Sequence, residues 1–246
     1  MKLLLELLLR IYKKIPLLQY IWRRAGSDES LMFVYVNGFK LKVFKKHWIR
    51  ILLNLYEPET LKVFKKILKK DMTFLDIGAN VGLFSCIAFN KKANVIAFEP
   101  NPFIKKILFE NFKGKGIKIF EFALSDREER LKLFLSDEPG SHSLNLDSKK
   151  YVFVKSVTLD SLINTKVDII KIDIEGAELK ALKGMEKLIE NFKPLVIIEI
   201  DEEHLRRFGE NFNSIKSFFA KYNYSYYKIE NENNYLFSYK TNEEDH

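Results

Sequence analysis

From residue 72 onward, short apolar runs alternate with amphipathic stretches, and this alternation constrains the fold more than any other feature of the chain. Such alternation is typical of βαβ units, which build a parallel sheet. The expected strands are Thr73–Ile77, Asn94–Phe98, Ile117–Phe122, Asp168–Ile172, Leu195–Ile200, Tyr224–Ile229 and Tyr235–Tyr239. The last two stand too close together for a crossover helix, so we expect them to form an antiparallel hairpin. The expected helices occupy residues 59–69, 82–90, 102–113, 177–191 and 212–222.

The first of these strands runs into a glycine-containing turn. Residues 74–82 read FLDIGANVG, so that Asp76 stands near the strand end and Gly78 and Gly82 frame the turn. Glycine lets a backbone approach a ligand closely, and ligands of open α/β sheets bind at the carboxyl ends of the strands. Two glycines replace the three of a dinucleotide site, and Asp76 disfavours a pyrophosphate. We therefore expect a ligand with a cationic or hydrogen-donating end.

Acidic side chains also follow the next two strands. Glu99 ends the strand Asn94–Phe98, where a carboxylate accepts hydrogen bonds from ribose hydroxyls in nucleoside-binding α/β folds. The alternative is a charge that stabilises a helix N-terminus, and the neighbouring glycine turn makes us favour the ribose. Asp126 is a candidate acceptor for an adenine amino group and is equally typical of a turn.

Several acidic and histidine side chains near the same edge of the sheet are candidates for catalysis. Asp173 follows the strand Asp168–Ile172 and is the strongest of them, whereas Glu175 and Glu178 are explained as well by a helix N-terminus. His204 follows the strand Leu195–Ile200. His142 lies in residues 136–150, which read as a loop able to order over a ligand, and an exposed loop histidine explains it better.

Taken in order, these segments resemble the FkbM-type class I methyltransferases, which use S-adenosylmethionine. The matching segments are YEPET at 56–60, LDIGANVG at 75–82, EPN at 99–101, ALSD at 123–126, VTLD at 157–160 and IKIDIEGAE at 170–178. The resemblance implies a Rossmann-like, seven-stranded, mostly parallel sheet and methylation of a hydroxyl on a sugar, a glycolipid or a secondary metabolite. The residues that we expect to bind the cofactor are Glu57, Asp76, Gly78, Asn80, Gly82, Glu99, Asn101 and Asp126.

Methyl transfer from a sulfonium requires the acceptor oxygen, the methyl carbon and the sulfur in line, and it requires a place for the hydroxyl proton. Asp173 is open to three roles: base, metal ligand, or orienting group. A Mg²⁺ ion held by Asp173, Glu199 or Asp201 would acidify the hydroxyl instead. We favour a site without metal, because no histidine joins the carboxylates and Lys171 adds positive charge to the strand. Lys171 is expected to point away from its sequence neighbours, so that its charge need not reach the site.

Two other functions use the same kind of sheet. An NAD-dependent oxidoreductase or epimerase is disfavoured by the missing third glycine and the acidic turn. A catalytically inactive scaffold would bind a nucleoside and recruit partners through the N-terminal segment. Turnover of labelled S-adenosylmethionine distinguishes the enzyme from the scaffold.

Residues 1–55 are expected to form a basic extension of a methyltransferase domain at 56–246, since residues 1–70 carry 16 basic and 5 acidic side chains. Asn37-Gly38 between two β-rich runs predicts a hairpin at 31–36 and 39–44. Residues 3–22 predict a helix with a wide apolar face and a narrow polar stripe. Such a helix lies at a membrane surface, or packs on its own domain or on a partner subunit.

The overall composition narrows the expected partners and compartment. The chain has 41 basic and 33 acidic side chains, yet no pattern in it reads nucleic-acid bases. We expect a small-molecule or glycan acceptor and peripheral membrane contact through residues 1–24, with the oligomeric state open. The single cysteine, Cys86, excludes an internal disulfide framework. Glu6 within the first apolar stretch argues against a signal peptide, so we expect a cytoplasmic protein.

Overall fold

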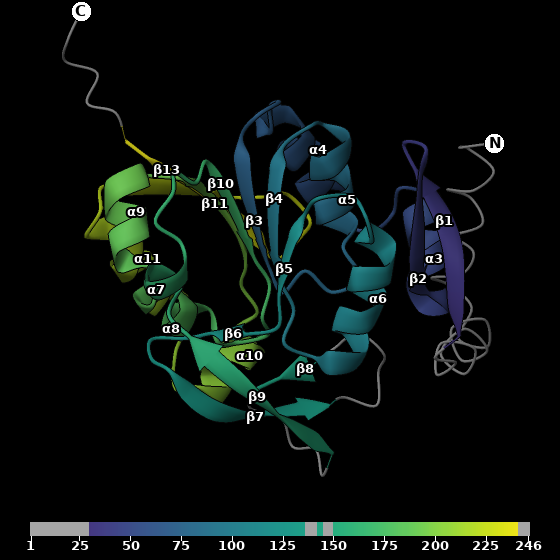
Figure 1. Ribbon diagram of the computed structural model, residues 1–246. Coiled ribbons are helices and arrows are strands. Elements are labelled where there is room, and N and C mark those ends of the chain that lie inside the picture. The colour runs from purple at the N-terminus through teal and green to yellow at the C-terminus, as the bar shows by residue number, and fades with distance from the viewer. Residues whose placement is uncertain (1–29, 136–141, 145–149, 241–246) are drawn as a thin grey trace, which may run out of the picture.

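The computed structural model describes residues 30–135, 142–144 and 150–240, which form a large sheet flanked by helices, a smaller sheet and a hairpin (Figure 1). The large sheet contains, in spatial order, β12 (Tyr224–Lys228), β13 (Asn234–Tyr239), β11 (Leu195–Glu199), β10 (Ile169–Ile172), β3 (Thr73–Ile77), β4 (Asn94–Phe98) and β5 (Lys118–Phe120). Strands β3, β4, β5, β10 and β11 are parallel, whereas β13 is antiparallel to β11 and to β12. This arrangement confirms the expected fold class, including the C-terminal antiparallel hairpin.

The order of the strands reverses at β3, which lies between β4 and β10. In the register of the sheet, Ile77 of β3 stands opposite both Phe98 of β4 and Ile172 of β10. The segments that follow these three residues therefore leave the sheet side by side. Ligands of open α/β sheets bind at such a reversal, so the fold brings the acidic residues at the three strand ends to one place.

Helices cover both faces of the large sheet, because its strands are apolar on both faces. On one face lie α4 (Pro58–Ile67), α5 (Leu83–Asn90) and α6 (Pro102–Phe112), whose buried side chains pack with Phe74 and Ile169. On the other face lie α8 (Glu178–Lys183), α9 (Glu186–Phe192) and α11 (Phe212–Ala220), which pack with Leu75 and Ile170 (Figure 1). Successive residues of one strand thus belong to opposite cores.

The helix expected at residues 177–191 is two helices, and the expectation of one was wrong. The chain turns at Gly184, where an added Cβ would lie 1.9 Å from the Ser125 carbonyl oxygen. The second helix, α9, has its own N-terminal partner, since the Asp160 carboxylate accepts hydrogen bonds from Lys187 N and Leu188 N, each at 3.0 Å. Asp160 belongs to the short α7 (Leu159–Leu162).

The N-terminal hairpin is confirmed at its expected residues, as β1 (Leu31–Val36) and β2 (Phe39–Phe44). Asn37 and Gly38 have φ angles of 49° and 83°, as a two-residue type I′ turn requires. Buried side chains of β2 belong to the same apolar core as α5 and α6. The boundary that we expect at residue 55, between the basic extension and the methyltransferase domain, stays a prediction.

A helix that sequence reasoning missed, α3 (Lys45–Leu52), follows β2 directly. It runs between the hairpin and α4, and none of its side chains is fully buried. The helix expected at residues 3–22 lies outside the described residues. Among the described residues, no helix is long and apolar enough to cross a membrane.

The smaller sheet was also missed by sequence reasoning. It contains, in spatial order, β6 (Ala123–Leu124), β9 (Tyr151–Val157), β7 (Glu129–Leu135) and β8 (His142–Ser143). It stands at the bottom of the view in Figure 1, below the carboxyl ends of the parallel strands. Its apolar side chains Leu133 and Val154 pack with Ala123. The sheet therefore adds a second wall to the edge where the acidic residues gather.

Candidate active site

A cavity of about 370 Å³ opens at the carboxyl ends of β3, β4, β10 and β11. Six of the residues expected at the functional site line it, namely Glu57, Gly78, Asn80, Glu99, Asp173 and His204. Apolar side chains of the smaller sheet and of the strand ends complete the wall, among them Phe98, Phe122, Leu124, Leu133 and Leu144. The cavity thus combines an acidic end with an apolar slot that suits a flat ring.

The glycine turn after β3 is held by its own hydrogen bonds. Gly78 N and Ala79 N both donate to the Phe98 carbonyl oxygen at 3.0 Å. Gly78 has a φ of 81°, and an added Cβ would lie 1.9 Å from the Asp173 carbonyl oxygen. Glycine is required here because the turns after β3 and β10 approach each other closely.

Glu99 is buried, and its carboxylate holds the two neighbouring turns together. Its Oε2 accepts a hydrogen bond from Asn80 N at 3.0 Å, and its Oε1 accepts one from Asn101 N at 2.9 Å. Burial raises the pKa of Glu99 to about 7, although both hydrogen bonds favour the ionised form. Each carboxylate oxygen has a second lone pair, so Glu99 fits a partner with two adjacent hydroxyl groups.

Four residues of the expected cofactor site do not line this cavity, because each has a structural partner elsewhere. The Asp76 Oδ2 accepts hydrogen bonds from Ser85 N at 3.0 Å and from Ser85 Oγ at 2.6 Å, and it faces a smaller adjoining cavity. Gly82 faces α6, where an added Cβ would meet Phe112 and Leu108 at 2.5 and 2.7 Å. The Asn101 side chain caps α6, and the Asp126 carboxylate accepts a hydrogen bond from Ser125 Oγ at 3.2 Å.

His142 cannot be placed at the cavity. Its backbone pairs with Leu135 in the smaller sheet, and its side chain lies outside the described part of the structure. Leu144, two residues further along, lines the cavity. The role expected for His142 therefore stays a prediction.

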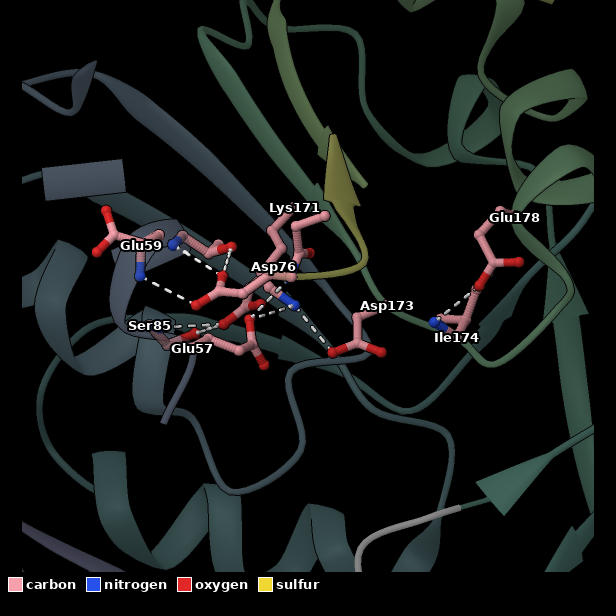
Figure 2. A network of polar contacts seen from close by, with 11 residues as sticks. Glu57, Glu59, Asp76, Ser85, Lys171, Asp173, Ile174 and Glu178 are labelled. Carbon is pink, nitrogen blue, oxygen red and sulfur yellow. Dashed lines mark hydrogen bonds and ion pairs between the residues drawn. The ribbon is translucent and has the colours of Figure 1, made fainter. Parts of the chain in front are cut away.

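A buried lysine stands at the centre of the acidic end. Lys171 of β10 is 2 % exposed, and its Nζ lies 2.8 Å from Asp173 Oδ2 and 3.9 Å from Glu57 Oε2 (Figure 2). The ammonium also stands over the Phe84 ring, 4.6 Å from its centroid. Lys171 lies on the opposite face of the strand from Ile170 and Ile172, as expected, but the inference that its charge need not reach the site was wrong. Residues two apart in a strand share a face, so Lys171 and Asp173 face the same way.

The carboxyl groups around Lys171 differ in protonation. Although burial opposes it, the Lys171 charge and a hydrogen bond from Glu199 hold the pKa of Asp173 below its usual range. The negative charge of Asp173 and burial raise the pKa of Glu199 to about 10. Glu199 is therefore protonated near neutral pH and donates to ionised Asp173, whereas burial raises the pKa of Glu57.

The position of Glu57 is fixed from the far end of the chain. Glu57 precedes α4 with a φ of 41°, and its Oε2 accepts a hydrogen bond from Asn234 Nδ2 at 3.4 Å. Glu232, in the turn before β13, accepts hydrogen bonds from Glu59 N at 3.0 Å and Thr60 N at 2.9 Å, and one from Thr60 Oγ1. The C-terminal hairpin thus caps the helix that carries Glu57.

Three further residues at the cavity come from the segment before α4, and sequence reasoning missed them. His47 and Arg50 lie on one face of α3, and Tyr56 follows it. Burial lowers the pKa of His47 to about 3, with the charges of Lys46 and Arg50 adding to the effect, and burial raises the pKa of Tyr56. The i, i+3 spacing of a histidine and an arginine just before the YEPET segment was the available signal.

Among the described residues, no three His, Cys, Asp or Glu side chains stand close enough together to hold one ion. Asp201, which we considered as a ligand, uses its Oδ1 to accept hydrogen bonds from Glu203 N at 2.8 Å and His204 N at 3.2 Å. It thereby caps the short helix α10 (Glu202–Arg207).

The strand order, its reversal at β3 and the acidic residues at the strand ends define a Rossmann-like class I methyltransferase. The family model of the methyltransferase FkbM domain matches residues 76–226. The chain therefore belongs to the FkbM methyltransferase family, whose methyl donor is S-adenosylmethionine. This membership sets aside the NAD-dependent oxidoreductase and the inactive scaffold.

Curated relatives and a solved structure agree with this assignment. The chain is 29 % identical over 202 residues to the hexuronic acid methyltransferase AglP of Haloferax volcanii, a match that covers 77 % of this chain and 83 % of the relative. It is 26 % identical to the methyltransferase sdnD of Sordaria araneosa over 46 % of this chain and 60 % of that protein. The crystal structure of methyltransferase FkbM from Methylobacillus flagellatus has the same fold, with a TM-score of 0.51 and 16 % identity over 79 % of this chain and 54 % of that one.

Proposed function

We propose that this enzyme transfers a methyl group from S-adenosylmethionine to a hydroxyl group of a sugar, with a hexuronic acid as the first acceptor to test. The acceptor class is supported by the similarity to a hexuronic acid methyltransferase, which extends over 83 % of that protein. The reaction is supported by one observation above all: Glu99 and Asp173, the partner of Lys171, line the same cavity. The donor requires a partner for its nucleoside, and the acceptor requires a charged group near its hydroxyl.

The residues of the cavity fit the donor. We assign Glu99 to the two ribose hydroxyls, because its remaining lone pairs can accept their hydrogen bonds. Phe98, Phe122 and Leu124 form the apolar slot for the adenine. Glu57 and Asp173 lie toward the glycine turn, where their charges attract a positively charged sulfonium or ammonium. When bound, the donor supplies an electrophilic methyl group.

Asp173 is suited to orient the acceptor rather than to deprotonate it. Its carboxylate is held ionised by Lys171 and by the hydrogen bond from protonated Glu199. A carboxylate with a lowered pKa is a weak base, yet it accepts a hydrogen bond strongly and fixes the direction of a hydroxyl. We therefore assign Asp173 the task of pointing the acceptor oxygen at the methyl carbon.

His204 is the residue that we assign to the proton. It lines the same cavity, and its proximity to Asp173 contributes to the lowered pKa of that carboxylate. An oxygen lone pair of the acceptor forms the new bond to the methyl carbon while the carbon–sulfur bond breaks and the sulfur keeps the electron pair. The hydroxyl proton passes to the imidazole of His204.

Transfer of a labelled methyl group tests this function directly. The purified enzyme is incubated with labelled S-adenosylmethionine and with glucuronic acid glycosides, and matched glucosides serve as neutral acceptors. We expect label in the uronic acid products. The loss of one catalytic group typically costs about 10²–10⁴-fold in rate, so His204→Asn should slow transfer by at least the lower figure without weakening donor binding. Label in neither acceptor would contradict the acceptor class, and a full rate in His204→Asn would contradict the assigned base.

A further inference from the structure

The backbone N–H groups of the glycine turn after β3 are all engaged in hydrogen bonds. Gly78 N and Ala79 N donate to the Phe98 carbonyl oxygen, and Gly82 N donates to the Ala79 carbonyl oxygen at 2.9 Å. Asn80 N donates to Glu99, and Val81 N donates to the Asn80 side chain at 2.8 Å. All five N–H groups of residues 78–82 are thus used within the protein. A carboxylate that enters the cavity therefore finds no backbone N–H partner in this turn.

Arg50 is the cation at the cavity that is available to bind a carboxylate. Among the described residues, it is the one lysine or arginine that lines the cavity at the strand ends, where ionised Asp173 and the carboxyl groups of Glu57, Glu99 and Glu175 gather. Its guanidinium stands over the Tyr56 ring, 5.3 Å from the centroid, and within the described residues it makes no hydrogen bond or ion pair. Lys171 is already engaged with Asp173.

Arg50 and Glu57 are side chains of opposite charge type at one cavity. The two side chains line one cavity and are close enough for the Arg50 charge to act on Glu57. His47, one turn before Arg50 on the same face of α3, lines the cavity as well. The methionine end of the donor carries one ammonium and one carboxylate, so it needs one anion and one cation side by side.

We propose that Arg50 binds the α-carboxylate of the donor's methionine end and that Glu57 binds its α-ammonium. This inference rests on the donor position given above, with the ribose at Glu99. It assigns a donor-binding role to α3, a helix that lies outside residues 76–226, where the family model matches. A guanidinium and a carboxylate form a bidentate, charge-assisted pair. This pair should account for most of the difference in affinity between a ligand with the carboxylate and one without it.

The test removes the carboxylate from the ligand and the guanidinium from the protein, separately and together. Calorimetry measures the binding of S-adenosylhomocysteine and of its decarboxylated analogue to the full chain and to Arg50→Gln. We expect the full chain to bind the analogue about 10- to 100-fold more weakly, because a charge-assisted hydrogen bond is lost. Arg50→Gln should bind S-adenosylhomocysteine about as weakly as the unmodified chain binds the analogue. The variant and the unmodified chain should bind the analogue with equal affinity.

Two control variants and a comparison within the unmodified chain make the result decisive. Lys45→Gln removes a charge from the same helix without touching the cavity wall and should bind both ligands normally. Arg50→Lys should recover part of the lost affinity. Equal affinity of the unmodified chain for the two ligands would overturn the proposal even if Arg50→Gln failed to fold. No binding of S-adenosylhomocysteine to the unmodified chain would instead contradict the donor site itself.

Discussion

The Lys171 ammonium lies 2.8 Å from the Asp173 carboxylate, and Lys171 has almost no contact with water. A lysine so deeply buried keeps its charge only because carboxylates surround it, and these raise its pKa well above the usual value despite its burial. The pair therefore links the stability of the sheet to the chemistry of the cavity. A substitution of Lys171 or Asp173 should therefore change both the stability and the activity.

Asp173→Asn is expected to lower turnover by about 10²-fold or more, because the acceptor hydroxyl loses its anionic partner. It should also lower the free energy of unfolding by on the order of 3 kcal/mol, because the Lys171 charge loses its nearest partner. Lys171→Met/Asp173→Asn should recover part of the stability and none of the activity. Urea titrations and single-turnover methylation of the three variants measure both effects. Near-normal turnover in folded Asp173→Asn would remove Asp173 from the mechanism.

Glu99 should make donor binding depend on pH. Its ligand-free pKa is about 7, and ribose hydroxyls donate more strongly to the ionised carboxylate than to the protonated one, so the affinity for S-adenosylhomocysteine should rise from pH 6 to pH 8. Glu99→Gln should flatten this dependence and weaken binding by about 2–4 kcal/mol, because a charge-assisted pair of hydrogen bonds is lost. Calorimetry at several pH values is the measurement. An unchanged affinity in the variant would refute the ribose assignment.

The same raised pKa predicts how the ligand-free protein responds to pH. Between about pH 4.5 and pH 7, folded Glu99 keeps a proton that the unfolded chain has released. The Glu99 contribution to stability is therefore full below pH 4.5 and is lost as the pH rises through about 7. Thermal unfolding of the unmodified chain and of Glu99→Gln should diverge over this range, and parallel curves would speak against the shift.

Glu232→Ala should destabilise α4 and weaken donor binding together. The change removes the acceptor of Glu59 N and Thr60 N, and the loss of such a cap costs about 1–2 kcal/mol. Since Glu57 directly precedes this helix, we expect a smaller loss of affinity for S-adenosylhomocysteine as well. Glu230→Ala, an exposed change in the same turn, is the matched control. If both variants unfold at the temperature of the unmodified chain, the cap has no energetic role.

Membrane contact through residues 1–24 stays a prediction, based on six basic side chains and one acidic side chain among mostly apolar residues. Each basic residue near an anionic surface contributes about 1 kcal/mol, and salt weakens the effect. The full chain should sediment with vesicles that contain phosphatidylserine at low salt, and a chain that begins at Ser27 should not. Equal sedimentation of the two would favour a helix that packs on protein.

The central sheet could be predicted because its signals are local. The expected bounds of β3 and β4 coincide with the observed ones, since an apolar run and the turn that follows it suffice to define a strand buried on both faces. The hairpin at Asn37-Gly38 was predicted for the same reason. The smaller sheet was not, although ERLKLFL and YVFVKSV alternate as half-buried strands do. The strand signal there was present and went unused.

The candidate site was predicted only in part because its residues depend on pairings between distant segments. Sequence position placed Glu99 and Asp173 at the cavity, as the ends of parallel strands. It also placed Gly82 and Asn101 there, although one packs on α6 and the other caps it. Nothing local to Glu232 indicates that it meets the helix that follows Glu57. Such relationships follow from tertiary packing, which a single sequence does not display.

The cap that Glu232 places on α4 joins residues 172 positions apart, and this has a consequence for the order of assembly during translation. A ribosome-bound chain that has released β3, β4 and β10 already has the core of the sheet, yet the helix beside Glu57 still lacks its acceptor. The last hairpin must emerge before that helix is fixed. Donor affinity should therefore reach its full value only after this hairpin has left the exit tunnel.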